Sequence, residues 1–148
     1  ITLAWCMPLS HKPPLAGISI AKTHFSNELI RNSREFAINV PDFSLLDKVV
    51  YCGTHSGREV DKFKETRLTP DKANRIAEPP LIAECVGHLE CKVEDIKEAG
   101  DHTLFIGRIV YAQAKEGLFS ENWCVNKIKL IFHLGGNKFT PSGEEIPV

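Results

Sequence analysis

Two long runs of strand-forming residues, separated by a short polar turn, constrain the fold of this chain more than any other feature. The first run extends over residues 81–96 and the second over residues 103–114. Both are rich in the branched and aromatic side chains that strands favour. The turn at residues 98–102 reads Glu-Ala-Gly-Asp-His, which is typical of a hairpin with a longer loop. We therefore expect two long antiparallel strands joined by a polar tip.

Shorter segments predict further strands. Residues 1–5 are apolar and β-prone, residues 15–21 and 35–40 read as strands, and residues 129–133 form a β-like run before two glycines. The prolines of residues 7–14 lack a backbone N–H for a sheet, so this segment is predicted to be a loop. Many strands joined by turns, with only short helices, indicate a mainly β protein, an antiparallel barrel carrying helical excursions.

Short helices are expected between these strands. The first covers residues 26–33, and the second opens at residues 41–42 and is predicted to end at Gly53. A third is expected to start at Ser56, because Ser56 and Glu59 match a capping box. Each helix is too short to form a layer of its own.

Composition limits the possible functions. A length of 148 residues favours a single domain with its own core. The net charge of −1 leaves no basic surface for a nucleic-acid backbone. No apolar run approaches the ~20 residues of a membrane-spanning helix, and no signal peptide is evident. Five cysteines at irregular spacing favour a reduced, cytoplasmic protein over a disulfide framework.

A zinc-binding module is an alternative use of the cysteines. Cys85, His88 and Cys91 form a C-x-x-H-x-x-C array, and Cys52 could supply a fourth ligand. However, side chains three apart on a strand face opposite ways, so Cys85 and His88 would diverge. Buried structural cysteines are therefore favoured, no metal is expected, and metal analysis would test the alternative.

The first candidate anion site stands where a strand meets a helix, at Thr23, His24 and Ser26. The first N–H groups of a helix lack internal partners and, together with the helix dipole, attract phosphate. Ser26 can cap the helix and can also donate its hydroxyl to a phosphate. Taken alone, a simple cap is the favoured interpretation.

The second candidate combines Ser56, Arg58 and Lys62. Arg58 and Lys62 are four apart and would share a helical face, where two cations suit a bound anion. The alternative is a solvated face on which Lys62 pairs with Glu59 or Asp61. Taken alone, the solvated face is favoured.

The hairpin tip and the first strand offer further candidates. His102 follows Asp101, which is typical of a simple Asx-type turn, but a loop histidine can also hydrogen-bond a ligand and titrate near neutral pH. Trp5, Met7 and Pro8 end the first strand and could cover a flat ring. An ordinary barrel rim would have the same composition.

Four segments, in order, resemble the flavin reductase-like, FMN-binding split-barrel family, and most of all its flavoredoxin-like branch. They are residues 1–41, YCGTHSGREVDKF at 51–63, AGDHTLFIGRIV at 99–110 and HLGGNKF at 133–139. The resemblance covers nearly the whole chain. It implies an antiparallel Greek-key split β-barrel with short helices and a homodimer with non-covalent FMN near the subunit interface.

The resemblance also assigns roles to residues. The segment from Trp5 to Pro8, with Ser10, would lie along the flavin ring, and Ser19 would sit on the strand beneath it. Thr23, His24 and Ser26 would meet the ribityl phosphate end. Ser56, Arg58 and Lys62 would approach the phosphate or the dimer-related site. His102, in a Gly-Asp-His motif, would guide the nicotinamide nucleotide and is the expected catalytic residue. The expected cofactor-binding residues are Trp5, Cys6, Met7, Pro8, Ser10, Ser19, Ile20, Thr23, His24, Ser26, Ser56, Arg58 and Lys62.

The expected activity is hydride transfer from NAD(P)H to FMN, as in an NAD(P)H-dependent flavin or ferric reductase. The alternative is a non-enzymatic FMN electron carrier of the flavoredoxin type, with a redox protein as partner. In either case the chemistry belongs to the flavin, which fits the lack of a catalytic dyad or triad. Relatives carry a further strand and a short helix before the segment that starts here at Ile1, and without them a barrel edge would be exposed.

Overall fold

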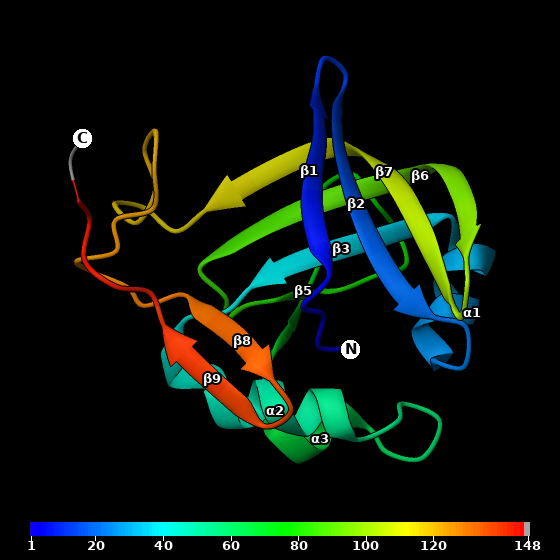
Figure 1. Cartoon of the computed structure of the whole chain (residues 1–148), viewed down its shortest axis with the longest axis horizontal. Helices are drawn as coiled ribbons and strands as arrows, with labels where there is room; N and C mark the ends of the chain where they lie inside the picture. The colour runs from blue at the N-terminus through cyan, green and yellow to red at the C-terminus, as the bar shows by residue number, and fades with distance from the viewer. Residues whose placement is uncertain (147–148) are drawn as a thin grey trace.

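The computed structural model describes residues 1–146 and shows a mainly β protein built on one antiparallel sheet (Figure 1). Every neighbouring pair of strands in this sheet runs antiparallel. Strands far apart in sequence become neighbours, as expected for Greek-key character. Across the sheet the order is β1 (Cys6–His11), β2 (Pro14–Ala21), β7 (His102–Ala114), β6 (Gly87–Ala99) and β3 (Glu35–Val40).

Short helices and two small strand pairs complete the described chain. Helix α1 follows β2 and lies beside the tip of the β6–β7 hairpin, while α2 and α3 lie together away from that tip (Figure 1). No described helix is long and apolar enough to cross a membrane. The remaining elements are α1 (Phe25–Ser33), η1 (Phe43–Leu45), α2 (Leu46–Thr54), α3 (Lys62–Thr66), β4 (Pro70–Asp71), β5 (Leu81–Ile82), β8 (Ile131–Gly135) and β9 (Lys138–Pro141).

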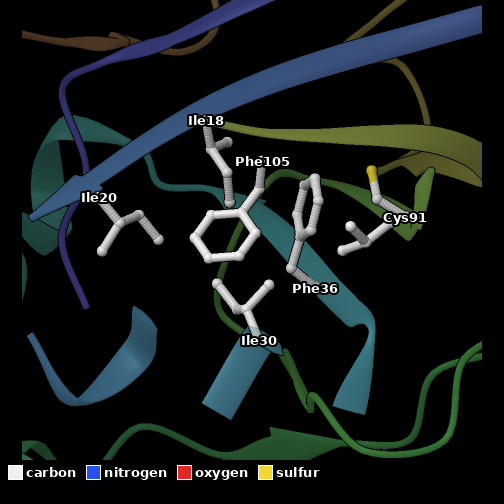
Figure 2. Packing of buried hydrophobic residues seen from close by; sticks show 7 residues of the cluster. Ile18, Ile20, Ile30, Phe36, Cys91 and Phe105 are labelled. Carbon is white, nitrogen blue, oxygen red and sulfur yellow. The ribbon is translucent and has the colours of Figure 1, made fainter. Parts of the chain in front are cut away.

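The core lies between the central strands and α1. Phe105 of β7 is fully buried and packs with Ile18 and Ile20 of β2 and Ile30 of α1 (Figure 2). Ala16, Ile18 and Ile20 are all buried, because alternate residues of β2 point to the core face of the sheet. The core cluster comprises Ile18, Ile20, Ile30, Phe36, Cys91, Val93 and Phe105.

Gly107 of β7 allows the Phe36 ring to pack directly on the sheet. A Cβ added at Gly107 would meet two Phe36 ring carbons at 2.5 Å and the Cβ of Cys91 at 3.0 Å. Gly107→Ala is therefore expected to lower the free energy of unfolding by about 1–3 kcal/mol through overpacking. Urea denaturation checks this value, and Gly143→Ala, where nothing lies within 4 Å, is the matched control. Equal stability of the two variants would contradict the close packing.

The predicted loop at residues 7–14 is wrong, because β1 occupies Cys6–His11. Pro8 is tolerated because β1 is an edge strand, where one side of the backbone needs no ladder partner. The pairing with β2 also shifts in register between Pro8 and Ser10, as in a bulge. Residues 1–5 carry no strand, although Trp5 accepts a backbone hydrogen bond from Ser19.

The strand predicted at residues 35–40 is confirmed with its ends unchanged as β3, and the remaining strand predictions are confirmed with changed ends. The run at 81–96 is divided into β5 and β6 by a turn, and the tip of the β6–β7 hairpin is tighter than expected. The C-terminal run starts at Ile131 and pairs with β9.

Three predicted helix ends are wrong. Helix α2 continues through Gly53 to Thr54 and ends on His55 as an extended C-cap. Helix α1 has His24 at its N-cap, which places Ser26 inside the first turn. Ser56 caps no helix: its hydroxyl accepts the Arg58 N–H in a local turn, so the proposed capping box does not form.

Helix α3 begins instead at Lys62. Asp61 is its N-cap and accepts a hydrogen bond from the Lys64 N–H at 3.2 Å. A carboxylate at the start of a helix also interacts favourably with the helix dipole, so Asp61 is a better N-cap than Ser56. Because Arg58 lies before the helix, Arg58 and Lys62 do not share a helical face.

Candidate functional site

An open pocket of about 820 Å³ lies between the start of α1 and the segment from the end of α2 to the start of α3. The two anion-binding candidates come from segments 30 residues apart, yet both line this pocket. The predicted residues that line it are Thr23, His24, Ser26, Ser56, Arg58 and Lys62.

The start of α1 supplies hydrogen-bond donors to this pocket. His24 is an extended N-cap without a side-chain capping bond, so it leaves the first amides of the helix uncapped by its imidazole. Within residues 1–146 the Ser26 hydroxyl makes no hydrogen bond, and Ser26 lines the pocket. Free helix-start amides and a hydroxyl on a nine-residue helix form an environment that suits an anion.

Arg58 is the cation at the pocket wall. Its guanidinium lies over the Phe25 ring, 4.3 Å from the ring centroid, and forms an ion pair with Glu28. Both side chains of this pair are about half exposed, so the pair is weak and easily exchanged. Arg58 is thus held at the pocket by an aromatic face and a replaceable carboxylate.

Lys62 has a contact that the sequence did not predict. Its Nζ donates to the Cys52 carbonyl oxygen at 2.6 Å, at the C-terminal end of α2, where a cation is favourable. Burial lowers the pKa of the Lys62 ammonium below its usual 10.5. The predicted pairing with Glu59 or Asp61 does not occur within the described chain. Lys62 therefore connects α2 and α3 and adds a positive charge to the pocket lining.

The residues predicted to lie along a flat ring form a second group outside this pocket. The Trp5 and His102 rings have centroids 4.7 Å apart, and the Trp5 carbonyl accepts the Ser19 N–H at 3.0 Å. Strand β2 connects the two groups, because Ser19 lies on it and Thr23 follows its end. The predicted residues outside the pocket lining are Trp5, Cys6, Met7, Pro8, Ser10, Ser19 and Ile20.

Two members of this second group differ in exposure. The Trp5 side chain is 62% exposed, so it is accessible to a ligand or a partner. Ile20 is only 2% exposed and packs in the core cluster, so only its backbone can meet a ligand. Ile20 is buried because successive residues of β2 alternate between the two faces of the sheet, so Ile20 faces the core and Ser19 the opposite side.

His102 stands at the hairpin tip with a defined orientation. Its Nδ1 donates to the Asp101 carboxylate at 2.7 Å, and this hydrogen bond lowers the pKa of Asp101. A neutral His102 then carries its acceptor lone pair on Nε2. The ring is therefore oriented by its neighbour and by the contact with Trp5.

The zinc alternative gains no geometric support. Among residues 1–146, no three His, Cys, Asp or Glu side chains lie together as a metal site would require. Cys85 and Cys91 are buried as free thiols, and burial raises their pKa values to about 11 and about 12. The His88 Nε2 forms a hydrogen bond with the Ile82 carbonyl oxygen at 2.9 Å.

A family model described as flavin reductase like domain matches residues 1–136. The chain belongs to the flavin reductase-like family. The family assignment and the antiparallel split-barrel fold expected from the sequence are thereby confirmed.

Relatives of this family member include an uncharacterized protein and a flavin reductase. An uncharacterized protein of Archaeoglobus fulgidus is 34% identical over 98% of this chain and 81% of its own length. An NADH-dependent FAD reductase of Streptomyces globisporus is 30% identical over 74% of this chain and 61% of its own length.

Two solved structures resemble this flavin reductase-like chain over almost its whole length. The FMN-binding protein from Thermus thermophilus superposes with a TM-score of 0.85 at 28% identity, over 99% of this chain and 79% of that one. The flavoredoxin of Desulfovibrio vulgaris superposes with a TM-score of 0.88 at 25% identity, over 99% of this chain and 79% of the flavoredoxin.

The sequence did not predict a role at the site for three residues, Phe25, Glu28 and Asn27. Phe25 and Glu28 hold Arg58 across a gap of about 30 residues, which no local pattern indicates. Asn27 anchors the first turn of α1 to the end of β2, and its spacing of four from Arg31 is the one local signal of that pair.

Proposed function

We propose that this protein binds FMN without a covalent link and reduces it with NAD(P)H. The observation that carries the proposal is the pocket in which the start of α1 meets Arg58. Uncapped helix amides, the Ser26 hydroxyl and the Arg58 guanidinium are the donors that a phosphate monoester requires. The names of the Thermus FMN-binding protein and of the flavoredoxin support the choice of flavin.

The chain's own residues divide into two roles in this proposal. The pocket residues hold the phosphate, while Trp5 and the backbone of β1 and β2 form a surface along which the ring extends. Bound FMN would supply a ring that accepts a hydride from the nicotinamide and passes electrons onward. The protein's part is to bind, orient and shield that ring.

His102 is the residue proposed to guide the nicotinamide nucleotide. Its imidazole lies beside the exposed Trp5 ring and is oriented by Asp101. The NADH-dependent FAD reductase among the relatives supports a nicotinamide as the donor. The electron acceptor beyond the flavin is free flavin or a ferric chelate in this proposal.

A carrier that exchanges electrons with a protein is the second candidate. Trp5, just before β1, and Met7 and Leu9 on β1 are all at least 41% exposed at this edge of the sheet. Such an apolar strip suits a redox partner or a second copy of this chain. A homodimer is therefore also proposed, and sedimentation equilibrium tests it.

A visible spectrum of the purified protein, before and after anaerobic NAD(P)H, tests the proposed function. Flavin bands that bleach with NAD(P)H support a reductase. Bands that bleach only with dithionite or a reduced redox protein favour the carrier. A colourless protein that gains no flavin bands from added FMN contradicts both.

His102→Ala is expected to leave the FMN dissociation constant unchanged and to slow reduction by NAD(P)H about 10- to 100-fold. The reason is that one oriented hydrogen bond to the second substrate, worth about 1–3 kcal/mol, is lost. Stopped-flow absorbance at the flavin band measures the rate. His133→Ala, at an exposed position of the β8–β9 hairpin, is the control. Loss of FMN from His102→Ala would show that His102 supports the cofactor instead.

A further inference from the structure

The β6–β7 hairpin tip, which carries His102, has few contacts of its own. Asp101 is 93% exposed in its side chain, and nothing lies within 4 Å of a Cβ placed at Gly100. The Lys22 N–H donates to the Asp101 carbonyl, and His102 and Thr103 pair with Ala21 and Ile20 in the β2–β7 ladder. A polar network behind the tip adds side-chain connections to α1.

Asn27 and Arg31 on α1 form the centre of this network. Asn27 is buried and donates through Nδ2 to the Ile20 carbonyl at 3.1 Å, which fixes α1 to the end of β2. Its Oδ1 accepts the Arg31 Nε at 2.8 Å. The amide of Asn27 therefore sets the direction of the Arg31 guanidinium.

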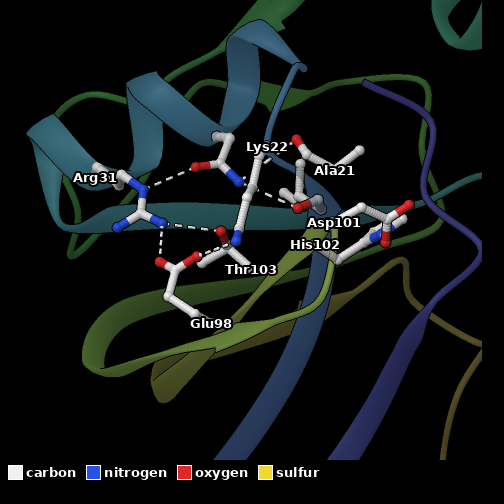
Figure 3. Close-up of polar contacts among 9 residues, drawn as sticks. Ala21, Lys22, Arg31, Glu98, Asp101, His102 and Thr103 are labelled. Carbon is white, nitrogen blue, oxygen red and sulfur yellow. Dashed lines mark hydrogen bonds and ion pairs between the residues drawn. The ribbon is translucent and has the colours of Figure 1, made fainter.

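Arg31 then connects the helix to both strands of the hairpin (Figure 3). Its Nη2 donates to the Thr103 hydroxyl at 2.9 Å and to the Glu98 carboxylate. Thr103 is fully buried and adjoins His102, whereas Glu98 also pairs with Lys22 at 2.9 Å. One guanidinium thus bridges α1, β6 and β7, which a single point charge could not do.

We propose that Arg31, oriented by Asn27, is a positioning residue that fixes the hairpin tip and His102 relative to the start of helix α1. On the proposed function, this contact holds His102, which guides the nicotinamide, at a fixed position relative to helix α1, which binds the flavin phosphate. Arg31 lies outside the pocket lining and acts through the hairpin, so its role is separate from ligand binding.

Hydrogen exchange tests the positioning role without any activity measurement. In Arg31→Met, amides of residues 99–103 are expected to exchange about tenfold faster or more, because a charge-assisted bridge is lost, while amides of residues 35–40 stay unchanged. Lys97→Met is the matched control, because Lys97 pairs with Asp95 on the same hairpin and does not bridge to α1. Arg31→Lys is expected to restore part of the protection and keeps the test informative if Arg31→Met folds poorly.

Reduction kinetics test the consequence for His102. Arg31→Met is expected to slow reduction of bound FMN, and Arg31→Met/His102→Ala to be no slower than His102→Ala alone. Unchanged exchange at residues 99–103, or equal acceleration at residues 35–40, would overturn the positioning role. Fully additive rate losses would overturn the action through His102. If the wild-type protein is not reduced by NAD(P)H, the proposed function fails, and hydrogen exchange still decides the role of Arg31.

Discussion

Glu90→Ala is expected to lower the free energy of unfolding by about 3–5 kcal/mol, the largest effect of any single substitution considered for this protein. The Glu90 side chain is fully buried on β6. Its carboxylate accepts N–H groups from Asn74 at 2.8 Å, Arg75 at 2.6 Å and Ile76 at 3.2 Å, and also the Asn74 side-chain amide. Removal would leave one buried donor and three partly buried donors without their acceptor.

Urea denaturation measures this loss, and Glu84→Ala provides the control. Glu84 also accepts hydrogen bonds, from the Thr69 N–H and hydroxyl, but it is only partly buried and these bonds are exposed, so water can replace the lost acceptor. The control is expected to cost about 1 kcal/mol or less. Similar losses of unfolding free energy in both variants would show that the burial of Glu90 does not increase the stabilisation from its hydrogen bonds.

The ionisation of Glu90 makes this contribution dependent on pH. Burial by itself would raise the pKa of Glu90, but the hydrogen bonds from Asn74, Arg75 and Ile76 outweigh it and hold the pKa below the usual 4.5. The stabilisation is complete above the unfolded-state pKa and is lost as the pH falls through the lower folded-state pKa. The stability difference between wild type and Glu90→Gln should therefore shrink from about pH 6 to about pH 3. A constant difference would contradict an ionised Glu90.

Ser26→Ala/Arg58→Ala is expected to weaken FMN binding by about 2–4 kcal/mol, or about 30- to 1,000-fold in the dissociation constant. Each single substitution should cost about 1–3 kcal/mol, because each removes one hydrogen bond to a charged phosphate. Loss of Arg58 also leaves Glu28 unpaired beside the pocket, which adds repulsion toward an anion. Fluorescence quenching of added FMN measures the affinity.

Riboflavin separates phosphate contacts from general damage to the pocket. It has the same ring without the phosphate, so its affinity should be unchanged in the double variant. Lys64→Met is the control for charge, because Lys64 lies in α3 two residues from Lys62 but outside the pocket lining. Equal losses for FMN and riboflavin would place Ser26 and Arg58 away from the phosphate.

Local patterns predicted the elements well where one signal dominated. The apolar run at residues 15–21 identified a strand, and the boundaries of β3 match those expected. Helix ends were predicted poorly where two nearby residues could each be the N-cap of the same helix, as Ser56 and Asp61 could for α3. The prolines of residues 7–14 were misleading, because their cost depends on whether the strand lies at an edge.

The candidate site could be predicted only in part. The hydroxyls and cations of the two segments indicated anion binding, but nothing local showed that Ser26 and Arg58 line one pocket. The Asn27 and Arg31 pair is visible as a spacing of four, whereas the partners of Arg31 lie 67 and 72 residues away in sequence. Such contacts depend on strand order, which no local periodicity encodes.

The sequence by itself determined the kinds of element and the chemistry each can offer, because alternation, turn residues and helix-start groups act over a few neighbouring residues. Tertiary structure alone decided which of these chemistries meet: the pairing of β2 with β7, the approach of Arg58 to α1, and the bridge from Arg31 to the hairpin tip. The physical reason is that burial and strand pairing join residues far apart in the chain, and only the folded sheet specifies those neighbours.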